Sequence, residues 1–295
     1  MSKIGFIGVG HMGGPMARNL LRTGHQVAVS DPSAANVAQL TSLGATQAAD
    51  AGALAADNEI VVSMLPSGKE LRAVYLGHNG VVARAKPNTL LIDCSTTDVE
   101  SARAVAKEAA DRGLRFIDAP VSGGVAGAEA GTLTFMAGGD EGALNAARPV
   151  LMAMGKNVVH TGGSGSGQAA KICNNMILGI TMIGVSEAFV LGEQLGLAPE
   201  KLFAVASTSS GQCWSLTSYC PVPGPVPNSP ANRGYAPGFA AKMMLKDLRL
   251  AVDAAEHVKQ GVELGELAKR VYERFVQEGG GELDFSAIIQ DIRQR

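Results

Sequence analysis

The segment from Ile4 to Leu21 constrains the fold more than any other stretch of the chain. An apolar, strand-like run leads through the spacing G-x-G-x-x-G into a helix-like sequence. Strand, tight turn and helix in this order leave free backbone N–H groups at a helix N-terminus, where phosphates bind. The glycines would permit the turn, the approach of a pyrophosphate and close packing of helix on strand. The predicted dinucleotide-binding turn comprises Gly8, Gly10, His11, Met12 and Gly13.

The next predicted strand, 26–30, ends at Asp31. An acid about 20 residues beyond such glycines is placed to bind the adenosine ribose of a dinucleotide. No arginine or lysine follows Asp31 closely, so nothing would neutralise a 2′-phosphate, and NAD is the predicted cofactor. The alternative interpretation is a glycine-rich turn followed by an unrelated surface acid.

Further buried strands alternate with helices through the first half of the chain. Strands are predicted over 59–65, 89–93, 115–119, 133–137 and 157–161, and helices over 34–43, 99–112 and 141–154. This alternation predicts a Rossmann-type, doubly wound parallel sheet, in which ligands bind beyond the carboxyl ends of the strands. The residues expected at those ends, and therefore near the cofactor, are Met64, Leu65, Pro66, Ser95 and Thr96.

A glycine- and serine-rich linker over 161–167 separates this pattern from a helical second half. We predict an NAD-binding domain over 1–163 and an all-α domain over 164–295, joined through a long helix over 168–195. Further helices are expected over 199–206, 240–257, 262–277 and 284–292. A long proline-rich loop over 207–238 has a length typical of functional or disordered segments.

Composition narrows the classes of partner. The 295 residues carry a net charge of −2, 46% are apolar and 4% are aromatic, and no basic block occurs. This balance favours a globular protein with a large core, and it predicts neither a nucleic-acid partner nor a membrane partner.

The cysteines and the apolar tracts bear on compartment and assembly. Four cysteines without a C-x-x-C pair predict reduced thiols, no metal site and a cytoplasmic location. The N-terminus lacks the continuous apolar stretch of a signal peptide. The tract 176–192 contains Glu187 and falls short of the ~18–20 uncharged residues of a membrane span. We expect a buried helix there, and a homodimer or homotetramer formed through the helices after residue 168.

Two polar side chains interrupt the start of that apolar helix. Lys171 and Asn175 are four residues apart and so share one helix face. A partly buried lysine loses hydration of its charged form, which lowers the pKa of such a group toward neutrality and suits it to acid–base chemistry. The alternative is an ordinary solvated helix start.

The predicted strand 115–119 runs into a loop over 120–128 that offers donors and little bulk. Successive backbone N–H groups at Ser122, Gly123 and Gly124 can form a concavity that binds anions, which suits a substrate carboxylate. A flexible hairpin without function would have the same composition.

Four segments resemble the β-hydroxyacid dehydrogenases, in order and across nearly the whole chain. They are 6–20, 118–124, the Gly165-x-Gly167-x-x-x-Lys171-x-x-x-Asn175 pattern, and 239–248. The resemblance implies Lys171 as the catalytic residue with Asn175 beside it, and residues 122–124 as the carboxylate site. It also implies cofactor contacts from Leu65, Pro66, Thr96 and Lys246, and a substrate contact from Asp247.

Within that family, the segments 213–224 and 233–235 are most similar to enzymes that oxidise 3-hydroxyisobutyrate to methylmalonate semialdehyde in valine breakdown. Siblings that act on tartronate semialdehyde, L-serine or 4-hydroxybutyrate are alternatives, as is a dinucleotide-binding module without catalysis. Trp214 and Phe239 are expected to wall off the non-reacting end of the small hydroxy-acid substrate. A purely structural role for Trp214 is the other interpretation.

Overall fold

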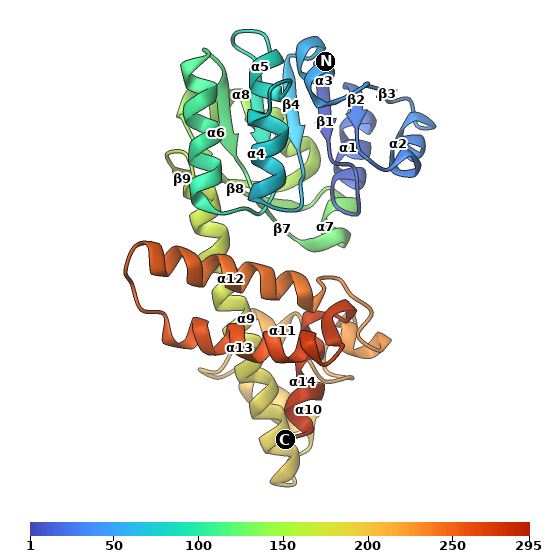
Figure 1. Ribbon diagram of the computed structural model, residues 1–295. Coiled ribbons are helices and arrows are strands. Elements are labelled where there is room, and N and C mark those ends of the chain that lie inside the picture. Colours follow the sequence, from blue (N-terminus) through green and yellow to red (C-terminus); the bar gives the residue numbers. More distant parts are fainter. The chain divides into compact units, whose positions relative to one another are not determined.

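The computed structural model describes residues 1–295, which form two compact units (Figure 1). The N-terminal unit comprises Met1–Lys171 and the C-terminal unit Ile172–Arg295. Helix α9 (Ser166–Gln194) begins in the first unit and ends in the second. The expected domain boundary between residues 163 and 164 stays a prediction.

One sheet organises the N-terminal unit, with strand order β3-β2-β1-β4-β5-β6-β8-β7 and β9 beside β8. The strands are β1 (Lys3–Ile7), β2 (Gln26–Ser30), β3 (Thr46–Gln47), β4 (Ile60–Ser63), β5 (Leu90–Asp93), β6 (Arg115–Asp118), β7 (Val121–Ser122), β8 (Leu133–Gly139) and β9 (Gly155–Gly162). From β3 to β6 all neighbours are parallel, which confirms the Rossmann-type arrangement.

The sheet is parallel-dominant, and its antiparallel pairing lies at the far edge. Strand β8 runs antiparallel to both β6 and β7, and β9 is parallel to β8. The connection from β7 to β8 consists of α7 (Gly124–Ala130) and its flanking turns. A parallel crossover needs roughly a dozen residues or more, and this connection is shorter, so the chain returns in the opposite direction. Residues 124–130 are therefore helical, where a loop over 120–128 was expected.

Helices cover both faces of this sheet (Figure 1). One apolar core lies under α1 (Gly13–Arg22), α2 (Ala34–Thr41) and α8 (Glu141–Met154); the other lies under α3 (Ala51–Asp57), α4 (Gly68–Leu76), α5 (Val81–Arg84) and α6 (Val99–Asp111). Alternate residues of a strand point to opposite faces, so Leu90 and Ile92 enter the first core and Leu91 the second.

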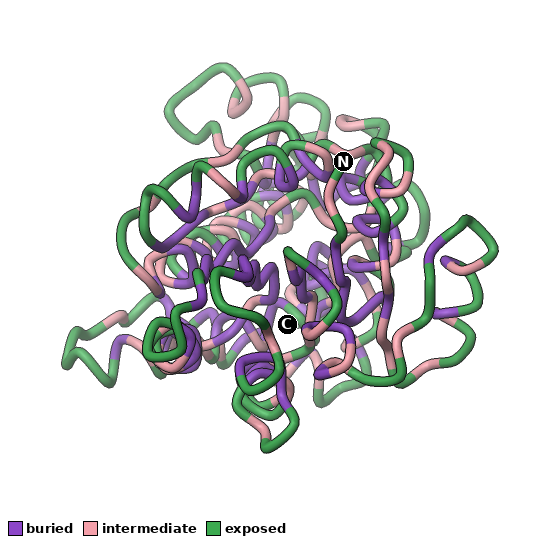
Figure 2. Tube along the Cα trace, turned by 90° about the horizontal axis from the view of Figure 1, so that it is seen from above, coloured by how far each residue is buried: buried purple, intermediate pink, exposed green.

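Local capping explains several helix starts. Asp98 accepts a hydrogen bond from the Ser101 N–H at 2.7 Å at the start of α6, and Asp140 caps α8 in the same way. Ser67 caps α4, a helix that the sequence-based prediction omits together with α3 and α5. The buried stretches run through the interior of the trace and the exposed stretches form its outer turns (Figure 2).

The C-terminal unit is helical, as predicted. After α9 come α10 (Pro199–Ala206), α11 (Trp214–Thr217), η1 (Pro230–Arg233), α12 (Ala241–His257), α13 (Glu263–Gln277), η2 (Gly280–Glu282), η3 (Phe285–Ala287) and α14 (Ile288–Arg293). The expected loop over 207–238 thus contains two short helical turns, and the expected helix over 284–292 begins as a 3₁₀ turn. The core of the unit includes Phe189, Leu248 and Tyr272.

Helix α9 is long and apolar. Its 29 residues include a window of mean hydropathy 1.6 that is long and apolar enough to cross a membrane, and one third of that window is buried. The tract 176–192 nevertheless contains Glu187 and has fewer than the ~18–20 uncharged residues of a membrane span. Core helices of soluble proteins pass the same test.

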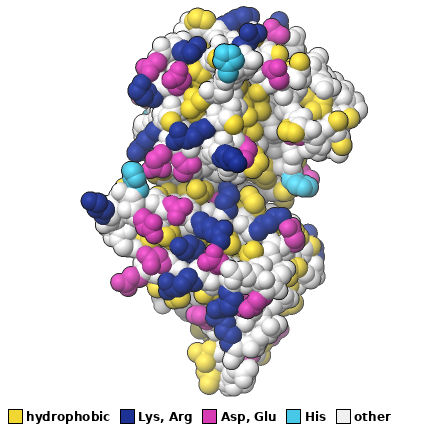
Figure 3. Space-filling model, viewed as in Figure 1, with side chains coloured by type: hydrophobic (Ala, Val, Ile, Leu, Met, Phe, Trp, Pro, Cys, Tyr) yellow, Lys and Arg dark blue, Asp and Glu magenta, His cyan; other side chains and the backbone are white.

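On the face shown in Figure 3, positive and negative side chains are intermixed.

Candidate active site

The turn between β1 and α1 has the shape that a pyrophosphate requires. Gly8 adopts a positive φ of 83°, and a Cβ at Gly13 would clash with the Gly8 carbonyl. Gly10 has no atom within 4 Å of the place where a Cβ would be, so the turn is open there. Met12, the N-cap of α1, makes no side-chain cap. These features fit a dinucleotide phosphate at the start of α1.

Asp31 follows β2 at the same edge of the sheet. Its Oδ2 accepts the Val9 N–H at 2.8 Å, and its Oδ1 accepts the Ser33 N–H at 2.8 Å. The Asn36 side-chain amide donates to Oδ1 at 3.4 Å. The carboxylate therefore ties the glycine-rich turn to the loop after β2, where the cofactor ribose is expected.

The residues that follow β4 and β5 are joined to each other. The Leu65 N–H donates to the Ser95 hydroxyl at 2.7 Å, and the Met64 N–H donates to the Ile7 carbonyl at 2.9 Å. Ser95 is buried, whereas Thr96 is half-buried. The predicted cofactor contacts of the N-terminal unit thus lie at the carboxyl ends of β1, β2, β4 and β5.

A buried carboxyl lies beneath these loops. Asp93 Oδ1 accepts hydrogen bonds from the Ser63 hydroxyl at 2.7 Å and the Ser95 hydroxyl at 2.5 Å, while Oδ2 has no hydrogen-bond partner. Burial raises the pKa of Asp93 to about 6, against the lowering effect of these hydroxyls. Tyr75 extends the network through its 2.8 Å contact with Ser63.

A second buried carboxyl, Asp118, pairs in register with Asp93 on the next strand. Its two oxygens accept the N–H groups of Gly165 at 2.7 Å and Gln168 at 3.0 Å. Burial raises the pKa of Asp118 to about 7, although these two hydrogen bonds lower it. Asp118 therefore anchors the start of α9 to the end of β6.

Lys171 is the only lysine or arginine in the chain that is buried, with 7% of its surface exposed. It lies one turn into α9, on the part of the helix that Asp118 anchors. Burying a cation is costly, so a buried lysine in such a place is typical of a functional group.

The polar residues predicted for the C-terminal unit form a cluster of their own. Asn175 donates a hydrogen bond from its side-chain amide to Asp247 Oδ2, and both residues are buried. The Lys246 ammonium lies 3.1 Å from Asp247 Oδ1. The structure thus brings Asn175 together with the adjacent pair Lys246 and Asp247, which lies 72 positions later at Asp247.

The expected carboxylate loop is a strand end followed by a helix start. Ser122 ends β7 and is half-buried, Gly123 adopts a φ of 136°, and α7 begins at Gly124 without a side-chain cap. Backbone N–H groups at such a start have no intrahelical acceptor. They can donate hydrogen bonds to a substrate carboxylate, as was expected of the loop.

Trp214 and Phe239 are linked through other aromatic rings. Trp214 stacks on Tyr219 at 4.8 Å between centroids, Tyr219 stacks on Phe285 at 5.3 Å, and Phe239 meets Phe285 edge-on at 5.8 Å. Asp284 accepts hydrogen bonds from the Tyr219 hydroxyl and the Phe239 N–H. Trp214 remains 51% exposed, so it ends a rigid aromatic row instead of filling a core.

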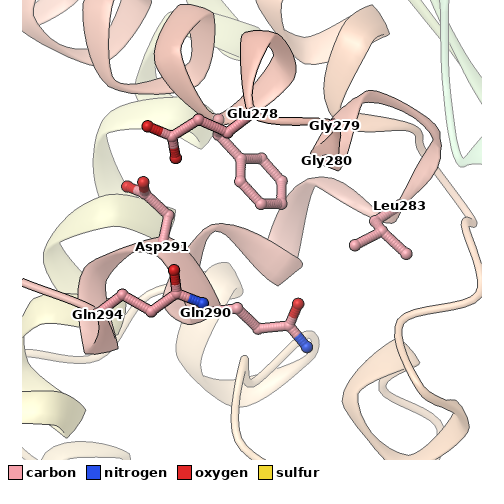
Figure 4. A pocket seen from close by; sticks show the side chains of 8 residues that line it. Glu278, Gly279, Gly280, Leu283, Gln290, Asp291 and Gln294 are labelled. Atoms are coloured by element: carbon pink, nitrogen blue, oxygen red, sulfur yellow. The ribbon is translucent and has the colours of Figure 1, made fainter.

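A hollow of about 240 Å³ in the C-terminal unit contains none of the predicted site residues (Figure 4). Its lining includes Glu278, which directly follows α13, Gln290 and Asp291 on α14, and Gln294, which directly follows α14. Asp291 is paired with Arg274 at 3.1 Å and with Arg295. These ion pairs give its carboxylate a structural role.

The sequence analysis did not identify three buried polar residues as part of the site: Asp93, Asp118 and Gln168. The signal for the two acids was a charged residue at the last position of an otherwise apolar strand. Gln168 carried no signal beyond its place after Gly167, because its partners come from residues about 70 positions earlier.

Two family models together match nearly the whole chain. The NAD binding domain of 6-phosphogluconate dehydrogenase matches residues 3–162. The NAD-binding region of NADP-dependent 3-hydroxyisobutyrate dehydrogenase matches residues 165–292.

Curated relatives and a solved structure cover the same span. A Pseudomonas aeruginosa 3-hydroxyisobutyrate dehydrogenase is 48% identical over 98% of this chain and 97% of its own length. An NAD-dependent L-serine dehydrogenase of the same organism is 45% identical with the same coverage. The structure of Mycobacterium tuberculosis 3-hydroxyisobutyrate dehydrogenase with L-serine is 45% identical, covers 99% of both chains and superimposes with a TM-score of 0.95.

Proposed function

Because this chain belongs to the 3-hydroxyisobutyrate dehydrogenase group of the β-hydroxyacid dehydrogenase family, we propose that it oxidises 3-hydroxyisobutyrate to methylmalonate semialdehyde with NAD. The observation that carries the proposal is Lys171, the one buried cation of the chain, at the anchored start of α9. A proton acceptor at this place is what the oxidation of an alcohol needs.

In this proposal the backbone N–H groups at Ser122, Gly123 and Gly124 hold the substrate carboxylate. Lys171, in its neutral form, takes the hydroxyl proton while the C–O bond becomes a carbonyl, and Asn175 orients the same hydroxyl. Bound NAD supplies the acceptor for the hydride that leaves the hydroxyl-bearing carbon. Asp247 orients Asn175 through the hydrogen bond between them.

NAD would be held by the residues at the carboxyl ends of the strands. We assign the phosphates to the turn over 8–13, the adenosine ribose to Asp31, and the nicotinamide side to residues 64–66, Ser95, Thr96 and Lys246. The partners of Asp31 are backbone amides and Asn36. A 2′-phosphate would meet this carboxylate without a compensating cation, and like-charge placement of that kind costs several kcal/mol.

A spectrophotometric screen of small hydroxy acids with NAD and NADP tests the proposal. We expect the largest kcat/KM for 3-hydroxyisobutyrate with NAD, and a clear preference for NAD over NADP. Equal kcat/KM for the two cofactors would overturn the role of Asp31. Absence of NAD reduction with every acid would favour a dinucleotide-binding module without catalysis.

L-Serine oxidation is the second candidate, favoured by the 45% identity to an NAD-dependent L-serine dehydrogenase. The same carboxylate site and the same lysine would serve it. The two substrates differ at the branch next to the carboxylate, where serine carries an ammonium group in place of a methyl. The ratio of their kcat/KM values decides between the candidates.

We further propose a cytoplasmic homodimer or homotetramer. The cysteines are free thiols, which supports a reducing compartment. Exposed apolar side chains gather on α9 and the following segment, including Ile177, Leu191, Leu195 and Leu197. A patch of this kind is typical of an interface between subunits, and light scattering coupled to gel filtration measures the assembly.

A further inference from the structure

Gln168 is fully buried and uses its whole side-chain amide to bind one short stretch of backbone. Its Oε1 accepts the Thr97 N–H at 2.9 Å, and its Nε2 donates to the Ser95 carbonyl oxygen at 2.8 Å. These two hydrogen bonds flank Thr96. The amide thus holds the loop after β5 in the way that a neighbouring strand would.

The backbone of the same residue is fixed as well. Its N–H donates to Asp118 at the end of β6, and Asp118 also accepts the Gly165 N–H. Close approach is built into the segment, since a Cβ at Gly167 would lie 2.6 Å from the Asp118 carbonyl oxygen. Lys171 follows three residues later, on the same side of the helix.

We propose that Gln168 is a positioning residue that sets the distance and orientation between Lys171 and the Ser95–Thr97 loop. The inference rests on the proposed function, in which Lys171 meets the substrate hydroxyl and Thr96 contacts the nicotinamide. Hydride transfer depends steeply on the alignment of donor and acceptor, and a displacement of about 1 Å costs up to ~10²-fold in rate. Gln168 acts through its neighbours and touches neither reactant.

The chemistry of the partners explains why glutamine occupies this position. Thr97 offers a donor and Ser95 an acceptor, and a side-chain amide is complementary to both. Methionine has a similar size and satisfies neither group. A glutamate side chain satisfies both only when it is protonated, because an ionised carboxylate would turn an acceptor toward the Ser95 carbonyl oxygen.

The experiment compares Gln168→Met and Gln168→Glu with the wild type across pH 5.5–9. We measure kcat, KM, NADH affinity by fluorescence, and the primary isotope effect with substrate deuterated at the hydroxyl-bearing carbon. For Gln168→Met we expect kcat to fall by ~10–10²-fold at every pH, with a larger isotope effect, because chemistry becomes limiting. NADH affinity should change by less than about threefold.

The pH dependence of kcat for Gln168→Glu tests the inference more directly. Its kcat relative to the wild type should rise as the pH is lowered, because the protonated carboxyl restores both hydrogen bonds. An added charge that acted only through Lys171 would disfavour the neutral lysine and lower the ratio toward acidic pH.

Gln39, on the exposed side of α2, provides the matched controls. Gln39→Met and Gln39→Glu should leave kcat, the isotope effect and their pH dependence unchanged. An unchanged isotope effect in Gln168→Met, or a Gln168→Glu to wild-type ratio that does not rise toward acidic pH, would overturn the inference. If Gln168→Met does not fold, the pH dependence of Gln168→Glu decides alone. A wild-type protein that oxidises none of the acids overturns the proposed function, and this inference falls with it.

Discussion

The two ends of α9 differ in what surrounds them. At the start, Gln168 and Lys171 are buried, and the N–H groups of Gln168 and of Gly165 just before the helix donate to Asp118. Further along, Ile177 and Leu191 expose apolar side chains, 61% and 60% of their surfaces respectively. Directional hydrogen bonds define position, whereas apolar contact is tolerant of small shifts. The comparison supports the two proposals that the first turns of α9 position the chemistry and that its later turns provide a surface for packing.

The largest expected effect belongs to the first turn. Lys171→Ala should lower kcat by ~10²–10⁴-fold, because it removes the proton acceptor. NAD affinity should be nearly unchanged, since most of the predicted cofactor contacts lie in other segments of the N-terminal unit. Lys201→Ala, at an exposed position on α10, is the control. If Lys171→Ala keeps more than about half of the wild-type kcat at pH 8, the assigned role is wrong.

The close packing of the first turn of α9 can be disrupted by a substitution that changes no polar side chain. A Cβ at Gly167 would lie 2.6 Å from the Asp118 carbonyl oxygen and clash with that of Met136. Gly167→Ala should therefore lower the free energy of unfolding by ~1–3 kcal/mol. Gly163→Ala is the matched control, because nothing lies within 4 Å of its Cβ position. Equal melting temperatures for the two variants would contradict the tight packing.

Asp118, which holds the first turn of α9, should make the free energy of unfolding depend on pH. The pKa of Asp118 is raised to about 7, so the folded state binds a proton that the unfolded state releases above its value of 3.8. Stability from this group is therefore present at low pH and is lost as the pH rises toward 7, by at most about 1.4 kcal/mol per pH unit. Asp93 contributes with the same sign.

Urea unfolding of wild type and Asp118→Asn between pH 4 and 8 measures this dependence. The difference in unfolding free energy, wild type minus variant, should decrease with rising pH. The same substitution at the exposed Asp57 should leave the slope unchanged. A difference that stays constant or increases with pH would refute the assignment.

A smaller effect is expected at the aromatic row of the C-terminal unit. If Trp214 selects the methyl branch of the substrate, Trp214→Ala should lower kcat/KM for 3-hydroxyisobutyrate more than for L-serine. A methyl contact is worth ~1–3 kcal/mol, and a half-exposed ring should deliver the lower end of that range. Equal losses on both substrates with a lowered melting temperature would instead make Trp214 structural.

The smallest effect on the folded subunit is expected in the later turns of α9. Leu191→Lys should change the stability of the subunit by less than about 0.5 kcal/mol, as surface substitutions usually do. It should nevertheless shift the oligomer toward smaller species in light scattering, because a charge would enter the apolar interface. Leu43→Lys, at an apolar position 53% exposed in the other unit, should leave the assembly intact. An unchanged oligomer in both variants would exclude this surface.

Elements with strong local signals were predictable from the sequence. Helix α8 begins after Asp140 and α10 begins at Pro199, as predicted, because a capping acid and a proline at the first turn act within a few residues. The dinucleotide turn was predictable for the same reason. Helix α4 was missed although Ser67 and Glu70 match the S-x-x-E sequence of a capping box, a local signal that was present.

The tertiary structure alone decided the direction of β8 and the environment of the first turn of α9. Strand periodicity identifies a strand but carries no information on its direction, which the connection through α7 determined. Gln168 became a bridge to Ser95 and Thr97 because the fold brings distant segments together. The sequence by itself thus determined the residue types and their local spacing, which limit the chemistry that each side chain can offer. Their burial, partners and pKa values depend on atoms supplied by distant parts of the chain, and those only the folded structure brings into place.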